Sequence, residues 1–89
     1  MKLPLRHRAT LKFWGLYEEL PSDIRTLADR NYVLLSRDPK HPSLHFKNIG
    51  RNRWSVRIGR DFRALALEHD MVFTWVWIGS HAEYDRLIG

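Results

Sequence analysis

The chain has 89 residues, carries a net charge of +5 and contains no cysteine. The absence of cysteine excludes disulfide bonds, a thiolate nucleophile and cysteine-ligated zinc. The longest apolar runs are about eight residues, well below the ~20 needed to span a bilayer, and no signal peptide is recognisable at the N-terminus. We therefore expect one soluble, cytoplasmic domain over residues 1–89, with no membrane partner.

Eleven of the 15 basic residues are arginine, against 10 acids. Guanidinium groups bind phosphate bidentately and stack on bases, so this composition favours a polyanionic partner such as nucleic acid. A basic surface also serves solubility, and charge alone does not separate these two explanations.

The N-terminal residues predict an arm followed by a helix. Residues 1–8 are basic and contain Pro4, which is typical of a loose arm or of an edge strand. Thr10 is a suitable N-cap for a helix that continues through Leu20, because large apolar side chains recur at helical spacing. Gly15 weakens this prediction.

A second helix is predicted after Pro21, which suits a first helical turn, with Asp23 near the positive end of the helix dipole. Asp38, which precedes a proline, ends this helix. Its apolar side chains form one stripe: Ile24, Leu27, Ala28, Tyr32 and Leu35. We expect the two helices to form a hairpin.

The period changes from helical to alternating after the hairpin. Four strands are predicted, at residues 44–48, 54–58, 62–68 and 71–78, with turns at 50–53 and 69–70. Tight turns between them imply an antiparallel meander with one face covered by the helices. The predicted fold class is therefore α+β: two helices on a four-stranded antiparallel sheet, with the N-terminal arm as a candidate extra edge strand. Its uncovered face should carry Ser55, Arg57 and Gly59.

Several kinds of chemistry are disfavoured. No serine stands in a G-x-S-x-G turn, and no glycine-rich phosphate loop is present. His41 and His45 are four residues apart, but they lie on a loop and at a strand start, which argues against a metal site. We expect no metal and no cofactor. His7 and His69 are expected in solvent.

Acid–base cleavage of RNA is compatible with the residues present. Attack by the 2′-hydroxyl needs a base, an acid for the leaving oxygen and a cation for the phosphate, which histidine with arginine or lysine can supply. Each candidate taken alone is better explained as an ordinary solvated strand residue; gathered on one concave face, the candidates would make a site. The candidates, all in or beside the predicted sheet, are His41, His45, Lys47, Arg53, Arg57, Arg60, Asp61, Arg63 and His81.

Three segments, LPSDIRTLADRNYVLLSRDPKHPSLHFKNI, RWSVRIGRDFRAL and WVWIGSHAEYDRLI, together resemble the RelE/ParE superfamily of toxins from type II toxin–antitoxin systems. The resemblance covers about residues 10–88 and is most specific in SVRIGRDFRAL and GSHxxYDxL. It implies two helices packed on a twisted antiparallel sheet, in agreement with the pattern above.

The resemblance implies one of two activities. RelE-like members enter the A site of the small (30S) ribosomal subunit and cleave messenger RNA without a metal, using a basic surface. ParE-like members poison DNA gyrase. Members of both branches are neutralised by a cognate antitoxin, and the pair commonly represses its operon by binding operator DNA through the antitoxin. The histidines favour the RelE-like branch; the alternatives are a gyrase poison and an inactive member that survives as a co-repressor.

Residue roles follow from the match to YafQ-like members. His81 lies where they place a catalytic histidine after the last strand, and His41 matches their histidine before a proline. Asp61 matches an aspartate, whereas Arg57 stands where they have a second histidine, so a cation replaces a general base. Tyr84 lies near a functional tyrosine of other RelE-like members, or it packs on the sheet.

The resulting assignment makes His81 the general acid or base, with His41 or His45 as its partner. Arg57 acts as a phosphate clamp and Asp61 as an orienting acceptor. The residues assigned to RNA and phosphate binding are Lys47, Arg53, Arg60, Arg63 and Tyr84.

The last segment combines two roles. Residues 79–80 turn the chain out of the sheet, which leaves His81 facing the basic surface. The residues that we expect to pack a short terminal segment back on the core are Tyr84, Leu87 and Ile88.

Overall fold

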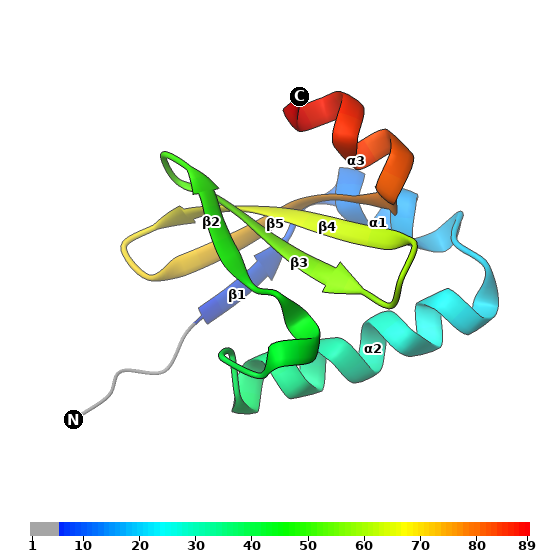
Figure 1. Cartoon of the computed structure of the whole chain (residues 1–89), viewed down its shortest axis with the longest axis horizontal. Helices are drawn as coiled ribbons and strands as arrows, with labels where there is room; N and C mark the ends of the chain where they lie inside the picture. The colour runs from blue at the N-terminus through cyan, green and yellow to red at the C-terminus, as the bar shows by residue number, and fades with distance from the viewer. Residues whose placement is uncertain (1–5) are drawn as a thin grey trace.

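The computed structural model describes residues 6–89, so Pro4 of the predicted arm lies outside the described residues. Three α-helices, a 3-10 turn and five strands make up this part of the chain (Figure 1). Their bounds are β1 (Arg6–Ala9), α1 (Leu11–Glu18), α2 (Ser22–Arg37), the 3-10 turn η1 (Pro42–Leu44), β2 (Lys47–Gly50), β3 (Arg53–Ile58), β4 (Phe62–His69), β5 (Val72–Ser80) and α3 (His81–Ile88).

The strands form one mixed sheet in the order β1-β5-β4-β3-β2. Strands β2 to β5 pair antiparallel, as predicted, and β1 joins the edge parallel to β5, with Arg6 opposite Val72 and Ala9 opposite Trp75. A parallel pair requires a long connection, which the rest of the domain provides here. The α+β fold class is therefore confirmed, and so is the use of the N-terminal arm as an edge strand.

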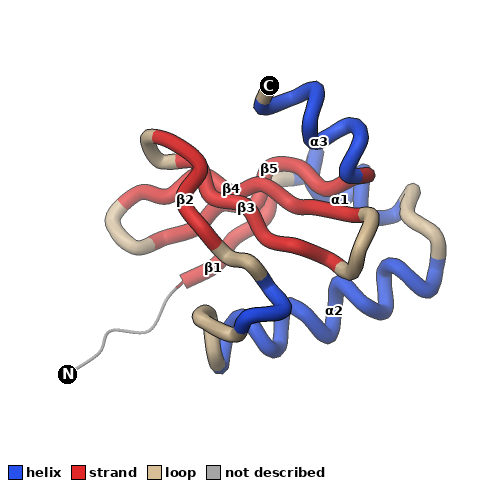
Figure 2. The backbone as a smooth tube through the Cα atoms, viewed as in Figure 1, coloured by secondary structure: helices blue, strands red, loops and turns tan. Residues whose placement is uncertain are grey.

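Helices lie on both faces of this sheet. α1 packs on β5 and α2 on β3, whereas α3 packs on β4 and β5. Figure 1 shows α2 and α3 on opposite sides, and Figure 2 shows the strands as a single twisted layer between them. The two N-terminal helices lie over different strands and are linked by a hydrogen bond of 2.7 Å from the Tyr17 hydroxyl to Asp29 Oδ1. The predicted hairpin is thus splayed.

The hydrophobic core lies between the sheet and the two N-terminal helices. On β3, Val56 and Ile58 face this core while Arg57 faces away, which is the predicted alternation. The buried apolar side chains are Leu20, Leu35, Leu44, Val56, Ile58, Ala64, Ala66, Phe73, Trp75 and Ile78.

The start of α1 follows the prediction and its end does not. Thr10 is the N-cap, and its hydroxyl accepts a hydrogen bond of 3.1 Å from the Phe13 amide. The helix ends at Glu18, before the predicted Leu20. Pro21 disfavours a helical backbone at the residue before it, and Leu20 instead inserts into the core from the connecting loop.

The strand predicted at residues 44–48 begins only at Lys47. Pro42 starts η1, Leu44 is fully buried within it, and His45 has a left-handed backbone with φ of 45°. A left-handed residue cannot continue an extended strand, so the alternation read from residue 44 was wrong for the first positions.

The β4–β5 reversal falls one residue later than predicted. Asp70 and Met71 have φ values of 49° and 68°, and two positive φ values are the signature of a type I′ hairpin turn. The Glu68 carboxylate accepts a hydrogen bond of 3.0 Å from the Met71 amide and closes the turn.

The terminal segment forms α3, capped by the Ser80 hydroxyl, which accepts from the Glu83 amide at 3.2 Å. Tyr84 is buried, as expected. The prediction that Leu87 and Ile88 pack on the core was wrong, because their exposed fractions are 54% and 36%. α3 rises away from the sheet toward the C-terminus, so its last turn has no strand to pack against (Figure 1).

Candidate functional site

One face of the sheet carries a row of cations. Because side chains alternate along a strand, Arg53 and Arg57 of β3 point away from the two N-terminal helices. Neighbouring strands add Lys47 of β2 and Arg63 of β4, and Arg60 is exposed in the β3–β4 turn. We call this surface the basic face; its cations are Lys47, Arg53, Arg57, Arg60 and Arg63.

Two residues predicted on this face do not contribute to its surface. Ser55 is only 3% exposed. Gly59 follows the end of β3 with φ of 61°, and a Cβ there would lie 2.7 Å from Leu27 Cδ2 of α2. Gly59 therefore permits the turn to approach α2 and does not shape the basic face.

Arg57 and Arg63 lie directly opposite each other on β3 and β4. Arg57 Nε donates to the carbonyl of Gly59 at 2.9 Å, and Arg63 Nη1 donates to the carbonyl of Phe62 at 2.7 Å. Across residues 6–89, no carboxylate lies within ion-pair distance of either guanidinium. Partial burial and then the charge of Arg57 lower the pKa of Arg63. An anion bound here would relieve that repulsion.

His81 opens α3 beside this arginine pair. Its backbone amide donates to the carbonyl of Asp61 at 2.7 Å, which ties the start of α3 to the β3–β4 turn. Its ring Nδ1 lies 3.0 Å from Asp85 Oδ2, one helical turn later, and its side chain is 44% exposed. The ring also makes an edge contact with Tyr84, with centroids 6.2 Å apart. The imidazole is thus held on two sides while remaining accessible.

Tyr84 anchors α3 to the sheet. Its ring lies 6.5 Å from that of Trp77 between centroids, and the residue is 7% exposed. The Trp77 ring in turn lies over Gly79, where a Cβ would stand 2.6 Å from the ring. Tyr84 therefore packs on the sheet, one of the two alternatives expected from the sequence.

The arginine pair and α3 form one electrostatic unit. Tyr84, Asp85 and Asp61 all lie close enough to Arg63 to raise its pKa, opposing the effects of burial and Arg57. We call the group around Arg63 the α3 cluster: Arg57, Arg63, His81, Tyr84 and Asp85. It combines an accessible imidazole, two cations and one carboxylate, which suffices for proton transfer next to a bound phosphate.

His41 and His45 lie elsewhere. His41 caps η1, and its Nδ1 accepts from the Ser43 amide at 3.2 Å. His45 is exposed just before β2. η1 lies beside the end of α2, away from α3 (Figure 1). Asp61, by contrast, contacts His81, through its main-chain carbonyl.

Three residues of this site were not among the sequence candidates. Asp85 carried a usable signal, because it stands four residues after His81 on a segment with helical spacing. Trp77 and Gly79 carried none: strand alternation places them on one face of β5, but it does not show that the indole ring lies over the glycine.

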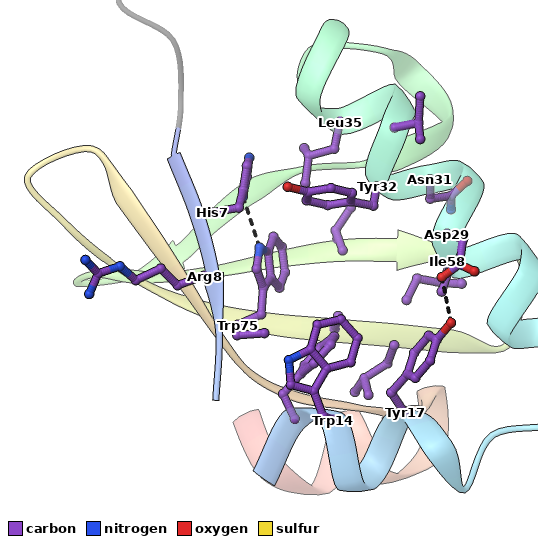
Figure 3. Close-up of a pocket in the computed structure, with 17 residues that line it drawn as sticks. His7, Arg8, Trp14, Tyr17, Asp29, Asn31, Tyr32, Leu35, Ile58 and Trp75 are labelled. Atoms are coloured by element: carbon purple, nitrogen blue, oxygen red, sulfur yellow. Dashed lines mark hydrogen bonds between the residues drawn. The ribbon is translucent and has the colours of Figure 1, made fainter. Parts of the chain in front are cut away.

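The opposite face of the sheet has an apolar groove of about 450 Å³ between α1, α2 and β1 (Figure 3). Its walls include Trp14 and Tyr32, which are 49% and 52% exposed, and its floor includes Trp75 and Ile58. The splayed helices leave this part of the core face uncovered. Large aromatic side chains at a groove rim are typical of a protein-docking surface.

His7 lines the groove, so the prediction that it is solvated was wrong. Pairing of β1 with β5 places His7 beside Phe73, and Trp75 Nε1 donates to its Nδ1 at 3.0 Å (Figure 3). Burial lowers the pKa of His7 from its usual 6.5. His69, with a side chain that is 91% exposed, is solvated as predicted.

Residues 6–89 contain no cluster of three or more histidines and acids positioned to hold a metal ion. In the same part of the chain, no helix has the length and apolar character needed to cross a membrane.

No model of a known protein family matches the chain, and no curated protein sequence matches it significantly. Solved structures match its fold. A chain of the RelB–RelE antitoxin–toxin complex of Methanococcus jannaschii superposes with a TM-score of 0.72 and 12% identity, over 92% of this chain and 99% of that chain. The toxin–antitoxin complex RelBE2 of Mycobacterium tuberculosis gives 0.67 and 21%, over 89% and 100%.

YafQ of Escherichia coli BL21(DE3) gives a TM-score of 0.70 at 9% identity, over 90% of this chain and 97% of that chain. At these identities the likeness concerns the backbone arrangement. It extends over nearly the full length of each matched chain. The protein therefore has the RelE-like toxin fold that the sequence resemblance predicted.

Proposed function

We propose that this protein is the toxin of a type II toxin–antitoxin pair, and that it cleaves messenger RNA in the ribosomal A site, in the cytoplasm. The observation that carries the proposal is the α3 cluster: two opposed arginines without a carboxylate partner, next to an accessible imidazole. Two cations at opposed positions repel each other and so destabilise the fold, whereas together they would stabilise the charge of a bound phosphodiester.

The cluster supplies two of the three groups that the reaction requires. Arg57 and Arg63 neutralise the charge that accumulates on the phosphate as the 2′-oxygen attacks. His81 transfers one proton. His41 and His45 serve as the second proton-transfer group only if the RNA spans the distance from η1 to α3, and Asp61 orients His81 through the main chain.

The rest of the basic face positions the RNA strand. Lys47, Arg53 and Arg60 are exposed and contact phosphates on either side of the scissile bond. Each phosphate neutralised on a single strand contributes about −0.7 to the slope of log affinity against log salt concentration. Binding should therefore weaken steeply as salt is raised.

The apolar groove supports the antitoxin part of the proposal. Solved structures with this fold include complexes of a RelE toxin with its RelB antitoxin. An exposed groove rimmed by Trp14 and Tyr32 offers a partner polypeptide apolar area to bury, on the face opposite the α3 cluster. The complex would then bind operator DNA through the antitoxin.

The test is cleavage of a defined message on purified ribosomes stalled with a known A-site codon, with product ends mapped by primer extension. We expect cleavage that depends on the ribosome. A parallel gyrase supercoiling assay addresses the alternative branch. Gyrase inhibition without RNA cleavage would replace the proposal by a ParE-like activity; inactivity in both assays, with repression of the operon intact, would indicate a co-repressor.

A further inference from the structure

The interaction between His81 and Asp85 has a chemical consequence. Asp85 Oδ2 lies 3.0 Å from His81 Nδ1, and both side chains are partly exposed, at 59% and 44%. An ionised carboxylate only accepts hydrogen bonds, so the contact requires a hydrogen on Nδ1. In the neutral imidazole the other nitrogen, Nε2, then carries a free lone pair.

We propose that Asp85 is a positioning residue that holds neutral His81 in the Nδ1–H tautomer and leaves Nε2 as the proton acceptor. Its catalytic consequence rests on the function proposed above. The proton of the RNA 2′-hydroxyl moves to Nε2 and the 2′-oxygen forms a bond to phosphorus. The bond from phosphorus to the 5′-oxygen breaks, and that oxygen takes a proton from water; the hydroxide so formed takes the proton back from Nε2, which restores the neutral imidazole. The products are a 2′,3′-cyclic phosphate and a 5′-hydroxyl.

The surroundings favour this role over a simple surface ion pair. Arg63 also lies near Asp85, but its Nη1 donates to the Phe62 carbonyl, and among residues 6–89 the ion-pair partner of the Asp85 carboxylate is the His81 imidazole. The His81 amide is fixed by the Asp61 carbonyl, and its ring rests on Tyr84. The backbone amide, the ring through its edge contact with Tyr84, and Nδ1 are all constrained, which leaves Nε2 as the free position. After proton transfer, the carboxylate also stabilises the imidazolium.

The same helix offers a matched control. Glu83 carries the same charge two residues before Asp85, but its carboxylate accepts from the Ser80 hydroxyl at 3.1 Å. Glu83→Gln therefore removes one negative charge from α3 without changing the partner of His81. Asp85→Asn removes the same charge and replaces the acceptor at Nδ1 by an amide that can also donate.

The first measurement needs no activity. In toxin labelled with ¹⁵N-histidine, long-range ¹H–¹⁵N correlation spectra report which ring nitrogen carries the hydrogen, and the His81 signals are assigned by their loss in His81→Gln. We expect the Nδ1–H pattern at a pH where the ring is neutral, in the wild type and in Glu83→Gln. Asp85→Ala and Asp85→Asn should move the ring toward the Nε2–H tautomer. An unchanged Nδ1–H pattern in both Asp85 variants overturns the proposal.

The second measurement is single-turnover RNA cleavage on programmed ribosomes. Asp85→Asn should reduce the maximal rate about tenfold or more with little change in the half-saturating ribosome concentration, because substrate binding is not altered. Asp85→Glu should restore part of the rate. Equal rates for Asp85→Asn and Glu83→Gln overturn the catalytic role even if the wild type cleaves RNA. Absence of cleavage by the wild type, with the expected tautomer shift, instead overturns the proposed function and supports the positioning role.

Discussion

Arg57 on β3 and Arg63 on β4 lie directly opposite each other on neighbouring strands, and each guanidinium group donates a hydrogen bond to a main-chain carbonyl. Like charges at directly opposite positions destabilise a sheet. Partial burial of Arg63 adds to this cost, as the direction of its pKa shift indicates. The phosphate binding proposed for this pair would offset that cost.

Replacement of Arg57 by methionine should separate stability from function. Methionine keeps most of the apolar stem and removes the repulsion, so we expect the free energy of unfolding in urea to rise by about 0.2–1 kcal/mol. RNA cleavage should fall sharply. Arg30→Met, at an exposed position on α2, is the control and should leave cleavage unchanged. A destabilised but active Arg57→Met protein would contradict this explanation.

His81→Ala should reduce the cleavage rate by about 10²–10⁴-fold, the usual contribution of a general acid or base. Growth arrest on induction should disappear while antitoxin binding persists. His69→Ala is the matched control, since His69 lies in the β4–β5 hairpin with a side chain that is 91% exposed. Undiminished toxicity of His81→Ala would remove this residue from the mechanism.

His7 should make stability pH-dependent. Burial lowers its pKa in the folded state, so the unfolded chain takes up the proton at higher pH than the folded chain. The stability contributed by neutral His7 is complete above about pH 6.5 and is lost as the pH falls through the lower folded-state pKa. Urea midpoints between pH 8 and pH 5 should fall more in the wild type than in His7→Asn, which cannot titrate. Parallel curves for the two proteins would exclude His7 as the cause.

Gly79→Ala should loosen α3. The added Cβ would lie 2.6 Å from the Trp77 ring, which must shift away from its contact with Tyr84. We expect a loss of about 1–3 kcal/mol in the free energy of unfolding, together with reduced cleavage. Gly15→Ala provides the contrast, because nothing lies within 4 Å of the new Cβ in α1 and the expected change is a gain of about 0.5–1 kcal/mol.

Trp14→Asp should impair antitoxin binding selectively. Trp14 is 49% exposed at the rim of the apolar groove, and loss of an aromatic anchor that a partner buries costs about 2 kcal/mol of binding, or some 30-fold in affinity. Calorimetric titration with the antitoxin of the proposed pair would measure the change. Ribosome-dependent cleavage should be retained, since the groove lies on the face opposite the α3 cluster.

Features that depend on neighbouring residues were predictable from the sequence. The alternation of residues 54–58 placed Arg57 on the face away from the helices, and Thr10 marked the start of α1. Short turns implied the antiparallel order of β2 to β5. Each of these depends on backbone geometry within a few residues, and the resemblance of the second half of the chain pointed to the same fold.

Features that depend on contacts between residues far apart in the chain were not predictable from the sequence. The parallel register of β1 on β5 buries His7 beside Trp75, 68 residues away in the chain, and no local pattern records that register. The left-handed backbone of His45 interrupts the strand predicted around it, and η1 holds His41 apart from α3. The chain by itself determined which residues are candidates for the proposed chemistry. Only the packing of α3 against β4 and β5 decided that His81 and the two arginines share one site, because that contact joins elements through side-chain shape rather than through sequence spacing.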